Sequence, residues 1–484
     1  MGILDGLKPE KVFRFFEEIT QIPHGSYNLD GIRSYLIEFA EKRNIECIAD
    51  EAGNVIFKSP ATPGYENSPI VVLQGHMDMV AVCETGIGFD MKTTPLDVFT
   101  DGDLIGARHT SLGGDNGIAV AMMLAILDSD DIPHPPLEML ITANEETGME
   151  GASGLDISNI KGRILINLDS EDEGIFTVGC AGGARVHCFL PSDAPSETSA
   201  EMSLHSISVS GLNGGHSGQM IHLGRGNAIK IIGSVLKAVS KQVPGAAMTD
   251  IKGGSADNAI PSSCTAVVMI PGADTGKFLS AANAELEKQK NKYKDTDPGF
   301  EFTVETGNAE SADGLITAGK AADFLEALPN GVIAMSKDVE GLVQTSLNLG
   351  IIKTEDGQLH AEFSVRSSIS EERDELIDRL LKITDEFGGT NKVTGKYPGW
   401  KYATVSPLRD RMVKVFRDMY GKDPKVEAIH AGLECGFFMD KAPDIDCVSI
   451  GPDMQDIHSP AERLSISSTT RTYDYLLEVL KSMK

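Results

Sequence analysis

The sequence lacks the marks of several common classes of protein. Its seven cysteines are an odd number, spread from Cys47 to Cys447 without a Cys-x-x-Cys pair, so neither a disulfide framework nor a zinc finger is indicated. Basic residues are few, since 43 Lys and Arg stand against 71 Asp and Glu and give a net charge of −28 at pH 7. Such a charge repels nucleic acid and anionic membrane surfaces, so we expect neither as a partner.

Long apolar runs are missing as well. The run at residues 118–127 is shorter than the about 20 residues that a membrane-spanning helix needs, so it predicts a buried helix. The first residues, MGILDGLKPEKVF, have no basic region followed by an apolar core, which a secretion signal would show. We therefore expect a cytoplasmic protein.

Two kinds of catalytic or binding motif are absent. No Gly-x-Ser-x-Gly occurs, since Ser217 is followed by Gly218 and then Gln219, so a serine hydrolase is not supported. Despite 50 glycines there is no Gly-x-x-x-x-Gly-Lys-Ser/Thr, and no Gly-x-Gly-x-x-Gly follows a predicted strand. A loop that cradles phosphate groups is therefore not supported either.

The hydrophobic pattern predicts an α/β fold. With 484 residues, 41% of them hydrophobic, the chain exceeds the roughly 250–300 residues at which single cores stop growing, so we expect two or three domains. Short apolar runs alternate with helical stretches, as in a mostly parallel sheet covered by helices. The runs that predict strands buried on both faces are residues 70–73, 137–141, 164–168 and 447–450.

The pattern changes between residues 187 and 394, where period-two stretches surround helices. We expect an inserted α+β domain there, with residues 1–186 and 395–484 forming the two parts of the catalytic domain. Two sets of elements follow one another in the same order, which predicts two similar βαββα halves. The first set covers residues 227–239, 248–251, 264–270 and 275–289, and the second covers residues 321–327, 341–352, 360–366 and 371–383.

Candidate metal ligands follow the four predicted strands. In chain order they are His76 with Asp78, Glu145 with Glu146, Asp169, and His458, and Asp115 in SLGGDNG stands just before the buried helix. Taken singly, a His-x-Asp is usually an ordinary hydrogen-bonded pair, and adjacent glutamates are usually solvated. Because ligands bind beyond the carboxyl ends of parallel strands, five such groups together indicate a metal site.

The motifs resemble a known family, the co-catalytic di-zinc metallopeptidases that include carnosinases, peptidase V and peptidase T. The stretches GHMDMV, SLGGDNGIA, ITANEETGMEG, INLDSED and IHSPAERLSI match its metal motifs in order. GGHSG, ADNAIPSS, FSVRSS and HAGLECG resemble its peptidase D branch, the aminoacyl-histidine and non-specific dipeptidases. The resemblance covers nearly the whole chain, and it implies that the inserted domain is a lid.

The resemblance also implies roles for the candidate residues. Asp115 would bridge two divalent ions, most often zinc with cobalt or manganese as alternatives, in a centre that His76, Glu146, Asp169 and His458 complete. Asp78 would orient His76, and Glu145 would transfer the proton of water.

In the lid, the resemblance implies a set of substrate-binding residues. His216 would bind the scissile carbonyl oxygen with the help of Asn258, and Arg366 would grip a substrate carboxylate near the backbone of Gly432 and Leu433. Without the family, GGHSG could be only a turn and Arg366 a surface arginine. In dimeric relatives the lid histidine serves the partner's active site, so both a monomer and a homodimer stay open.

The expected activity is hydrolysis of the peptide bond of dipeptides by a metallo-dipeptidase. An N-acyl amino acid deacylase is the alternative, because it also cleaves an amide beside a carboxylate. A metal-dependent binding module on a decayed enzyme fold would lack the catalytic base, whereas Glu145 is present.

Overall fold

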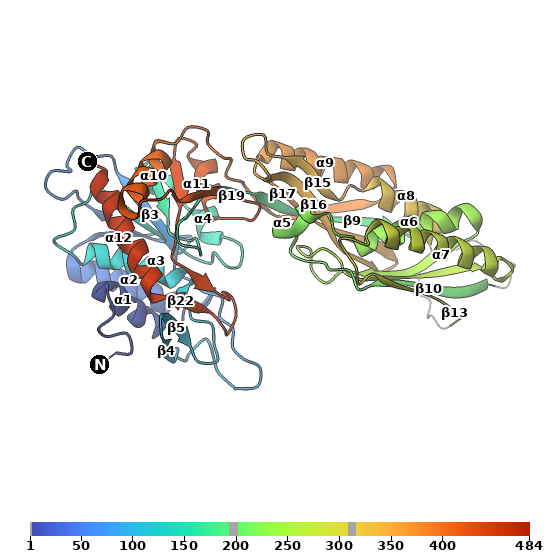
Figure 1. The fold of residues 1–484 in the computed structure, drawn as a ribbon, viewed down its shortest axis with the longest axis horizontal. Helices are drawn as coiled ribbons and strands as arrows, with labels where there is room; N and C mark the ends of the chain where they lie inside the picture. Colours follow the sequence, from blue (N-terminus) through green and yellow to red (C-terminus); the bar gives the residue numbers. More distant parts are fainter. Residues whose placement is uncertain (1, 193–201, 308–315) are drawn as a thin grey trace. The chain divides into compact units, whose positions relative to one another are not determined.

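The computed structural model describes residues 2–192, 202–307 and 316–484, which form two compact units. Unit 1 comprises Met1–Gly179, Tyr402–Ala428 and Leu433–Lys484, and unit 2 comprises Cys180–Lys401 and Ile429–Gly432. Figure 1 shows unit 1 in blue, cyan and red, and unit 2 in green to orange. Each unit is described by itself below.

Unit 1 is built on an eight-stranded sheet in the order β1-β2-β6-β3-β7-β20-β8-β19. Its strands are β1 (Glu46–Ala49), β2 (Val55–Ser59), β3 (Val71–His76), β6 (Leu137–Thr142), β7 (Ile164–Asn167), β8 (Ile175–Cys180), β19 (Lys425–Ile429) and β20 (Asp446–Ser449). The central strands β6, β3, β7 and β20 are parallel, whereas β1, β2 and β8 pair antiparallel with their neighbours. Every residue of β3 and β6 is buried, as the continuous apolar runs predict.

Helices complete unit 1 together with a small second sheet. The helices are α1 (Glu10–Thr20), α2 (Asp30–Arg43), α3 (Gly114–Leu127), α4 (Glu150–Gly154), α10 (Pro407–Tyr420), α11 (Cys435–Lys441) and α12 (Ile466–Ser482), with a 3-10 turn at Ile157–Asn159. The small sheet has the order β21-β22-β5-β4 and consists of β4 (Val98–Asp101), β5 (Leu104–Ala107), β21 (Met454–Gln455) and β22 (Arg463–Ser465).

Helix α3 contains the apolar run that the sequence analysis assigned to a buried helix. No residue from Ile118 to Ile126 is more than 1% exposed, because α3 packs between α1 and β3. None of the helices in the described part of the chain is long and apolar enough to cross a membrane.

Unit 2 is a ten-stranded antiparallel sheet with helices packed on it. Its strands are β9 (Gly182–Pro191), β10 (Met202–Ser210), β11 (Ala247–Gly253), β12 (Cys264–Pro271), β13 (Glu301–Thr306), β14 (Ile316–Thr317), β15 (Gly331–Met335), β16 (Val343–Glu355), β17 (Gln358–Ser367) and β18 (Thr390–Tyr397). Its helices are α5 (Ser217–Met220), α6 (Ala228–Gln242), α7 (Thr275–Lys292), α8 (Ala318–Ala327) and α9 (Ser370–Glu386), with 3-10 turns at Ile221–Leu223 and Gly272–Asp274.

The sheet of unit 2 consists of two similar halves, as predicted. Its order is β13-β10-β12-β11-β16-β17-β9-β18, which reads the same from either end once β10 is matched with β9, β11 with β16, β12 with β17, and β13 with β18. The matched helices are α6 with α8 and α7 with α9. The halves meet where β11 pairs antiparallel with β16. The second half begins at β9, so the first half is inserted between β9 and the rest of the second half.

Alternation along the strands of unit 2 separates its two faces. Val186, Cys188 and Leu190 of β9 belong to the hydrophobic core beneath the helices, and α9 packs on β9 and β17. In β17, from His360 to Arg366, every second residue belongs to this core. The residues between the core positions, which include His360 and Arg366, point to the opposite face because side chains alternate along a strand. That opposite face carries polar side chains, which are considered below.

Candidate metal centre

Parallel pairing brings the carboxyl ends of the central strands of unit 1 to one edge of the sheet. His76, the last residue of β3, is in register with Thr142, the last residue of β6. Asn167, the last residue of β7, is in register with positions near the ends of β3 and β20. The side chains that follow these strand ends therefore lie close together.

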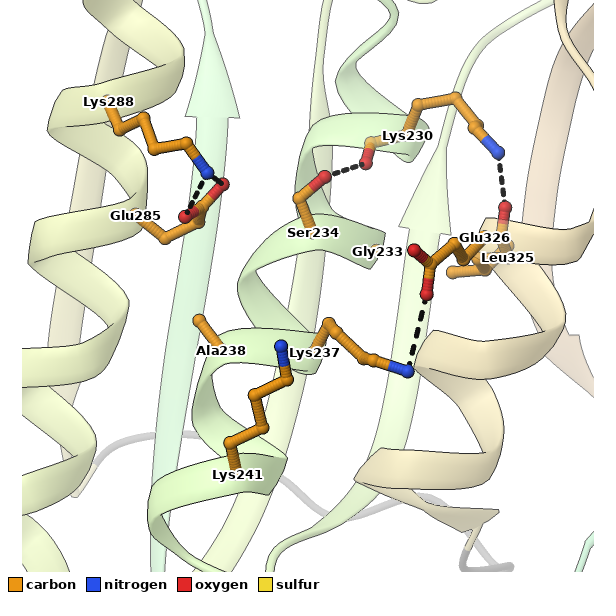
Figure 2. A pocket seen from close by; sticks show the side chains of 10 residues that line it. All are labelled: Lys230, Gly233, Ser234, Lys237, Ala238, Lys241, Glu285, Lys288, Leu325 and Glu326. Carbon is orange, nitrogen blue, oxygen red and sulfur yellow. Dashed lines mark hydrogen bonds and ion pairs between the residues drawn. The ribbon is translucent and has the colours of Figure 1, made fainter.

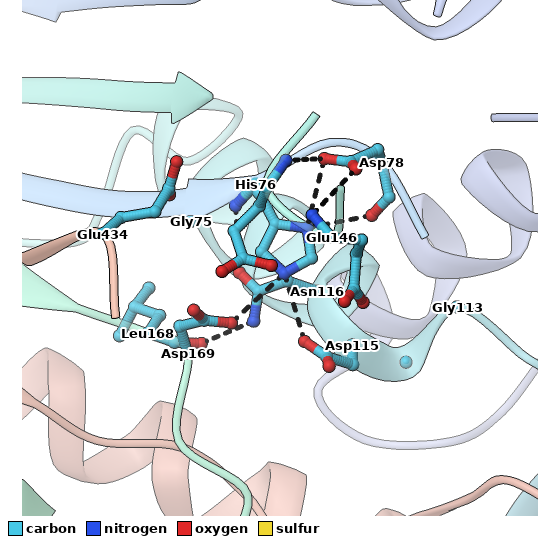
Figure 3. A network of polar contacts seen from close by, with 12 residues as sticks. Gly75, His76, Asp78, Gly113, Asp115, Asn116, Glu146, Leu168, Asp169 and Glu434 are labelled. Carbon is cyan, nitrogen blue, oxygen red and sulfur yellow. Dashed lines mark hydrogen bonds and ion pairs between the residues drawn. The ribbon is translucent and has the colours of Figure 1, made fainter. Parts of the chain in front are cut away.

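Two histidines share one carboxylate at this edge. Figure 3 shows one of them, His76, with Asp115 and Asp169. His76 Nε2 lies 3.2 Å from Asp115 Oδ1 and 3.3 Å from Asp169 Oδ1. His458 Nε2 lies 3.2 Å from Asp115 Oδ2 and 2.9 Å from Glu146 Oε1. Because the two oxygens of Asp115 face different histidines, the six atoms form two adjacent groups of ligands with Asp115 between them.

The loop before α3 places Asp115. Gly113 has φ 70°, in the left-handed region that favours glycine, and a Cβ there would lie 2.8 Å from Met79 Sδ. Asp115 itself has φ −83° and ψ 103°, which lie outside the helical region. Its side chain therefore does not follow the regular helical arrangement of the rest of α3. The short glycine-rich stretch is thus required by the turn that presents the carboxylate.

The electrostatics of this cluster call for a cation. Burial raises the pKa of Asp169 to about 7 although His76 opposes it, and burial raises the pKa of Glu145 well above its ordinary value. Hydrogen bonds with Asp115 and Glu146 raise the pKa of His458 to about 10. Imidazole nitrogens and carboxylate oxygens within 4.8 Å of one another are a donor set that fits zinc and similar divalent ions.

Asp78 holds the chain around the centre. Its carboxylate accepts hydrogen bonds from the backbone N–H groups of Glu145 (2.9 Å) and Glu146 (3.3 Å) and from the Ser26 hydroxyl (2.8 Å). His76 Nδ1 lies 2.9 Å from the Asp78 carbonyl oxygen and 3.5 Å from its Oδ1. The backbone carbonyl is therefore the nearer acceptor for the imidazole, and the carboxylate mainly positions the two glutamates.

Two buried glutamates escaped the sequence analysis. Glu462 accepts hydrogen bonds from the backbone N–H groups of residues 112–115, at 2.6 to 3.3 Å, and so fixes the loop that carries Asp115. Glu434 accepts from Thr142 Oγ1 and Gln74 Nε2, both at 2.6 Å, and burial raises its pKa to about 8. Both lie in motifs that were recognised for other residues, IHSPAERLSI and HAGLECG.

The remaining predicted residues lie in unit 2. His216 forms a β-bridge with Ala259, and Ser217 N–H donates to the Asn258 carbonyl at 2.8 Å, so the GGHSG and ADNAIP stretches lie side by side. Arg366, on β17, is 8% exposed, and its Nε is buried without a hydrogen-bond partner among the residues that the structure describes. Gly432 lies in the short segment Ile429–Gly432 that belongs to the same unit.

Arg366 has neighbours that the sequence analysis did not single out. His430 Nε2 lies 2.7 Å from Ser346 Oγ, and Ser346 is the register partner of Arg366 on β16. Burial and then the charge of Arg366 lower the pKa of His430 to about 3, and the same two causes lower the pKa of His216. The guanidinium therefore faces two neutral imidazoles and needs an anion to balance it.

A pocket of about 380 Å³ in unit 2 does not resemble a second site for an anion (Figure 2). It lies on α6, α7 and α8 and carries several lysines, but Lys288 pairs with Glu285 at 3.0 Å and Lys237 pairs with Glu326 at 3.3 Å. Lys230 donates to the carbonyl oxygens of Leu325 and Leu328. These three lysines are satisfied by the protein itself, and Lys241 is the fourth lysine that lines the pocket.

The fold and the sequence together define the class of the protein. A profile of peptidase family M20/M25/M40 matches residues 72–482, and the chain belongs to this family. It is a peptide hydrolase, as the motifs predicted.

Two relatives match over the full length. The chain is 34% identical over 487 residues to the cytosol non-specific dipeptidase of Escherichia coli (strain K12), covering 100% of this chain and 99% of that protein. The crystal structure of aminoacylhistidine dipeptidase from Vibrio alginolyticus matches with a TM-score of 0.92 and 34% identity over 99% of this chain and 98% of that one. Aminopeptidase PepT from Bacillus cereus ATCC 10987, at 16% identity and a TM-score of 0.57 over 99% of both chains, shares the fold.

Proposed function

We propose that this protein hydrolyses the peptide bond of dipeptides with the help of two divalent metal ions. The observation that carries the proposal is the carboxylate of Asp115, whose two oxygens face His76 and His458 within a full-length match to a non-specific dipeptidase. A cytoplasmic location is part of the proposal, supported by the cytosolic relative.

His76, Asp115 and Asp169 would hold one ion, and Asp115, Glu146 and His458 would hold the other. Zinc is the ion we propose, with cobalt and manganese as substitutes, because imidazole and carboxylate ligands accept all three. When bound, such ions supply Lewis acidity that polarises a carbonyl group and lowers the pKa of water.

Glu145 is proposed as the group that moves protons. It is partly buried, and Asp78 holds its backbone N–H, so its position is fixed relative to His76. A carboxylate there can accept the proton of the attacking water and deliver it to the leaving amine.

In unit 2 we propose that Arg366 binds the carboxylate of the dipeptide and that His216 donates to the scissile carbonyl oxygen, with Asn258 and the Gly432 backbone assisting. The unpartnered Arg366 Nε and the unpartnered, buried His216 Nδ1 support these roles, because both atoms lack a hydrogen-bond partner within the described residues. The neutral His430 next to Arg366 leaves the guanidinium charge available for an anion.

The substrate class is tested with the purified protein, a panel of dipeptides, tripeptides and N-acetyl amino acids, and a measurement of released amine. Dipeptide hydrolysis that disappears with a chelator and returns with zinc, cobalt or manganese is expected. Cleavage of N-acetyl amino acids without cleavage of dipeptides would instead assign an N-acyl amino acid deacylase. The two-halved lid is compatible with a monomer and with a homodimer. Sedimentation velocity distinguishes the monomer of 51.8 kDa from the homodimer.

A further inference from the structure

The face of the unit 2 sheet opposite the helices carries a group of histidines outside the candidate metal centre. His187 lies on β9, and His360 and Glu362 lie on β17. Glu362 is the register partner of His187, and His360 pairs with the neighbouring position, Phe189. The three side chains come from two adjacent strands and point to the same side of the sheet.

The distances within this group match those between ligands of one small cation. His187 Nδ1 lies 3.1 Å from His360 Nε2 and 3.7 Å from Glu362 Oε2, and one ligand atom from each residue lies within 4.8 Å of the others. Around a tetrahedral zinc ion with bonds of about 2.0–2.2 Å, neighbouring ligand atoms are separated by roughly 3.3–3.5 Å. The observed separations lie on both sides of this value.

The surroundings fix both imidazole rings. His360 stacks on Phe189 with ring centroids 4.5 Å apart and an angle of 15° between the planes. His187 Nε2 lies 3.3 Å from the Thr394 hydroxyl on β18, which can accept its proton. That contact leaves the lone pair of His187 Nδ1 directed toward His360 and Glu362, as outer hydrogen bonds do for metal-binding histidines.

Hydrogen bonding within the protein does not account for the group. A single proton between His187 Nδ1 and His360 Nε2 satisfies that pair but brings no positive charge to the group, and His360 Nδ1, the other nitrogen of that ring, is buried without a hydrogen-bond partner among the described residues. Glu362 Oε2 lies 3.7 Å from His187 Nδ1, which carries a positive charge only if His187 is protonated. A divalent cation bound between them would balance this carboxylate beside two imidazole rings.

We propose that His187, His360 and Glu362 form a third metal site, which binds a divalent transition metal ion with zinc as the expected occupant. Three protein ligands leave one position of a tetrahedral ion for water, and the side chains of His187 and Glu362, which are 18% and 17% exposed, are the members of the group that solvent reaches. The ion ties β9 to β17, the strand that also carries Arg366 on the same face.

The test is the number of zinc ions that the full-length protein binds. Metal-free protein is titrated with zinc in competition with a chromophoric chelator, and the wild type is compared with His360→Gln and Glu362→Gln. Each variant should bind one ion fewer than the wild type, and titration with cobalt should show the loss of one set of visible absorption bands. Equal numbers of ions in the wild type and both variants would overturn the proposal.

A matched control is His205→Gln, which removes another lid histidine whose ring contacts Ser203 and Thr306 instead. It should bind as many ions as the wild type, and a loss of one ion in this control would also overturn the proposal. Circular dichroism checks that both variants are folded, and Glu362→Gln, at the less buried of the two positions, keeps the test valid if His360→Gln does not fold. Because the readout is a difference of one ion, it does not depend on dipeptide hydrolysis, and failure of the proposed function would appear separately in the amine assay.

Discussion

Glu145 and Glu146 are neighbours in the chain with different surroundings. Glu146 Oε1 is 2.9 Å from His458, whereas Glu145 is held through its backbone N–H by Asp78. We expect Glu145→Gln to keep both ions in the centre while kcat falls by about 10²–10⁴-fold, because proton transfer is lost. Elemental analysis and single-turnover kinetics give the measurement.

Glu146→Gln serves as the comparison for that variant. It should lose occupancy of the ion near His458 together with activity. If Glu145→Gln loses metal while Glu146→Gln keeps it, the two roles are exchanged.

Arg366 is a buried guanidinium with an unpartnered Nε. Replacing it with alanine should raise the KM for dipeptides by about 10–100-fold, the equivalent of a charge-assisted hydrogen bond of about 1.5–3 kcal/mol. Metal content should not change. Arg379→Ala, at an exposed position of α9, is the control and should keep the KM of the wild type. An unchanged KM for Arg366→Ala would remove this residue from substrate binding.

At the residue scale the sequence marked the side chains that the structure brings together in the candidate metal centre, but not those behind them. His76, Asp115, Glu146, Asp169 and His458 follow strand ends or a glycine-rich loop, which are readable patterns. Glu434 and Glu462 act through backbone and side-chain hydrogen bonds over more than 290 residues of sequence, and no local pattern marks such contacts. The contacts of Asp78 with the backbone of Glu145 and Glu146 were not predicted for the same reason, because they depend on register.

Glu462 supports an element, the first turn of α3. Glu462→Gln would replace an acceptor oxygen by an amide group that faces backbone donors, and we expect a loss of at least about 2 kcal/mol in the free energy of unfolding. Metal content should fall as well, since the loop also carries Asp115. Urea unfolding and elemental analysis check this, with the exposed Glu478→Gln on α12 as the control.

Asp128 joins three helices at the end of α3. Burial raises the pKa of its carboxyl, but hydrogen bonds from Arg43, Lys11 and Arg14 outweigh burial and hold the pKa below its ordinary value of 3.8. A carboxylate with a lowered pKa stabilises the fold above the unfolded pKa, and this contribution is lost as the pH falls through the folded pKa.

Asp128→Asn should therefore lower the free energy of unfolding by about 1 kcal/mol at pH 7, and the difference from the wild type should shrink below pH 3.8. Urea unfolding at pH 7 and at the lowest pH where the fold persists measures both values. Asp130→Asn, at an exposed position two residues away, should show no such difference. A difference that grows toward low pH would contradict the assignment.

The elements themselves were largely predictable, because apolar runs and periodicity are local. Residues 137–141 lie within β6, and residues 275–289 lie within α7. What the sequence did not reveal is which strands are neighbours, for example that β9 completes the second half of the lid and that β20 lies between β7 and β8. Strand order depends on contacts between distant segments, which no window of sequence contains.

The whole molecule consists of two units. The candidate metal centre lies in unit 1, and the proposed third metal site lies in unit 2. Ions that bind only the folded centre of unit 1 stabilise that unit by about 2.7 kcal/mol per site when free metal is 100 times the dissociation constant. We expect a chelator to lower the Tm of the wild type, and to lower it less in Asp115→Asn, which already lacks the shared ligand. Calorimetry with and without zinc gives the measurement, and an equal shift in both proteins would show that the centre does not couple metal to folding.

The position of β20 has a consequence for the time course of synthesis. Strand β7 pairs with β3 along one edge and with β20 along the other. The last residue of β7 leaves the ribosome about 280 residues before the end of β20. At about 5–20 residues per second, β7 exposes an unpaired, hydrophobic edge for roughly 15–55 seconds. During translation this nascent chain therefore offers an aggregation-prone surface, and chaperones that shield such edges should associate with it until residues 446–449 emerge.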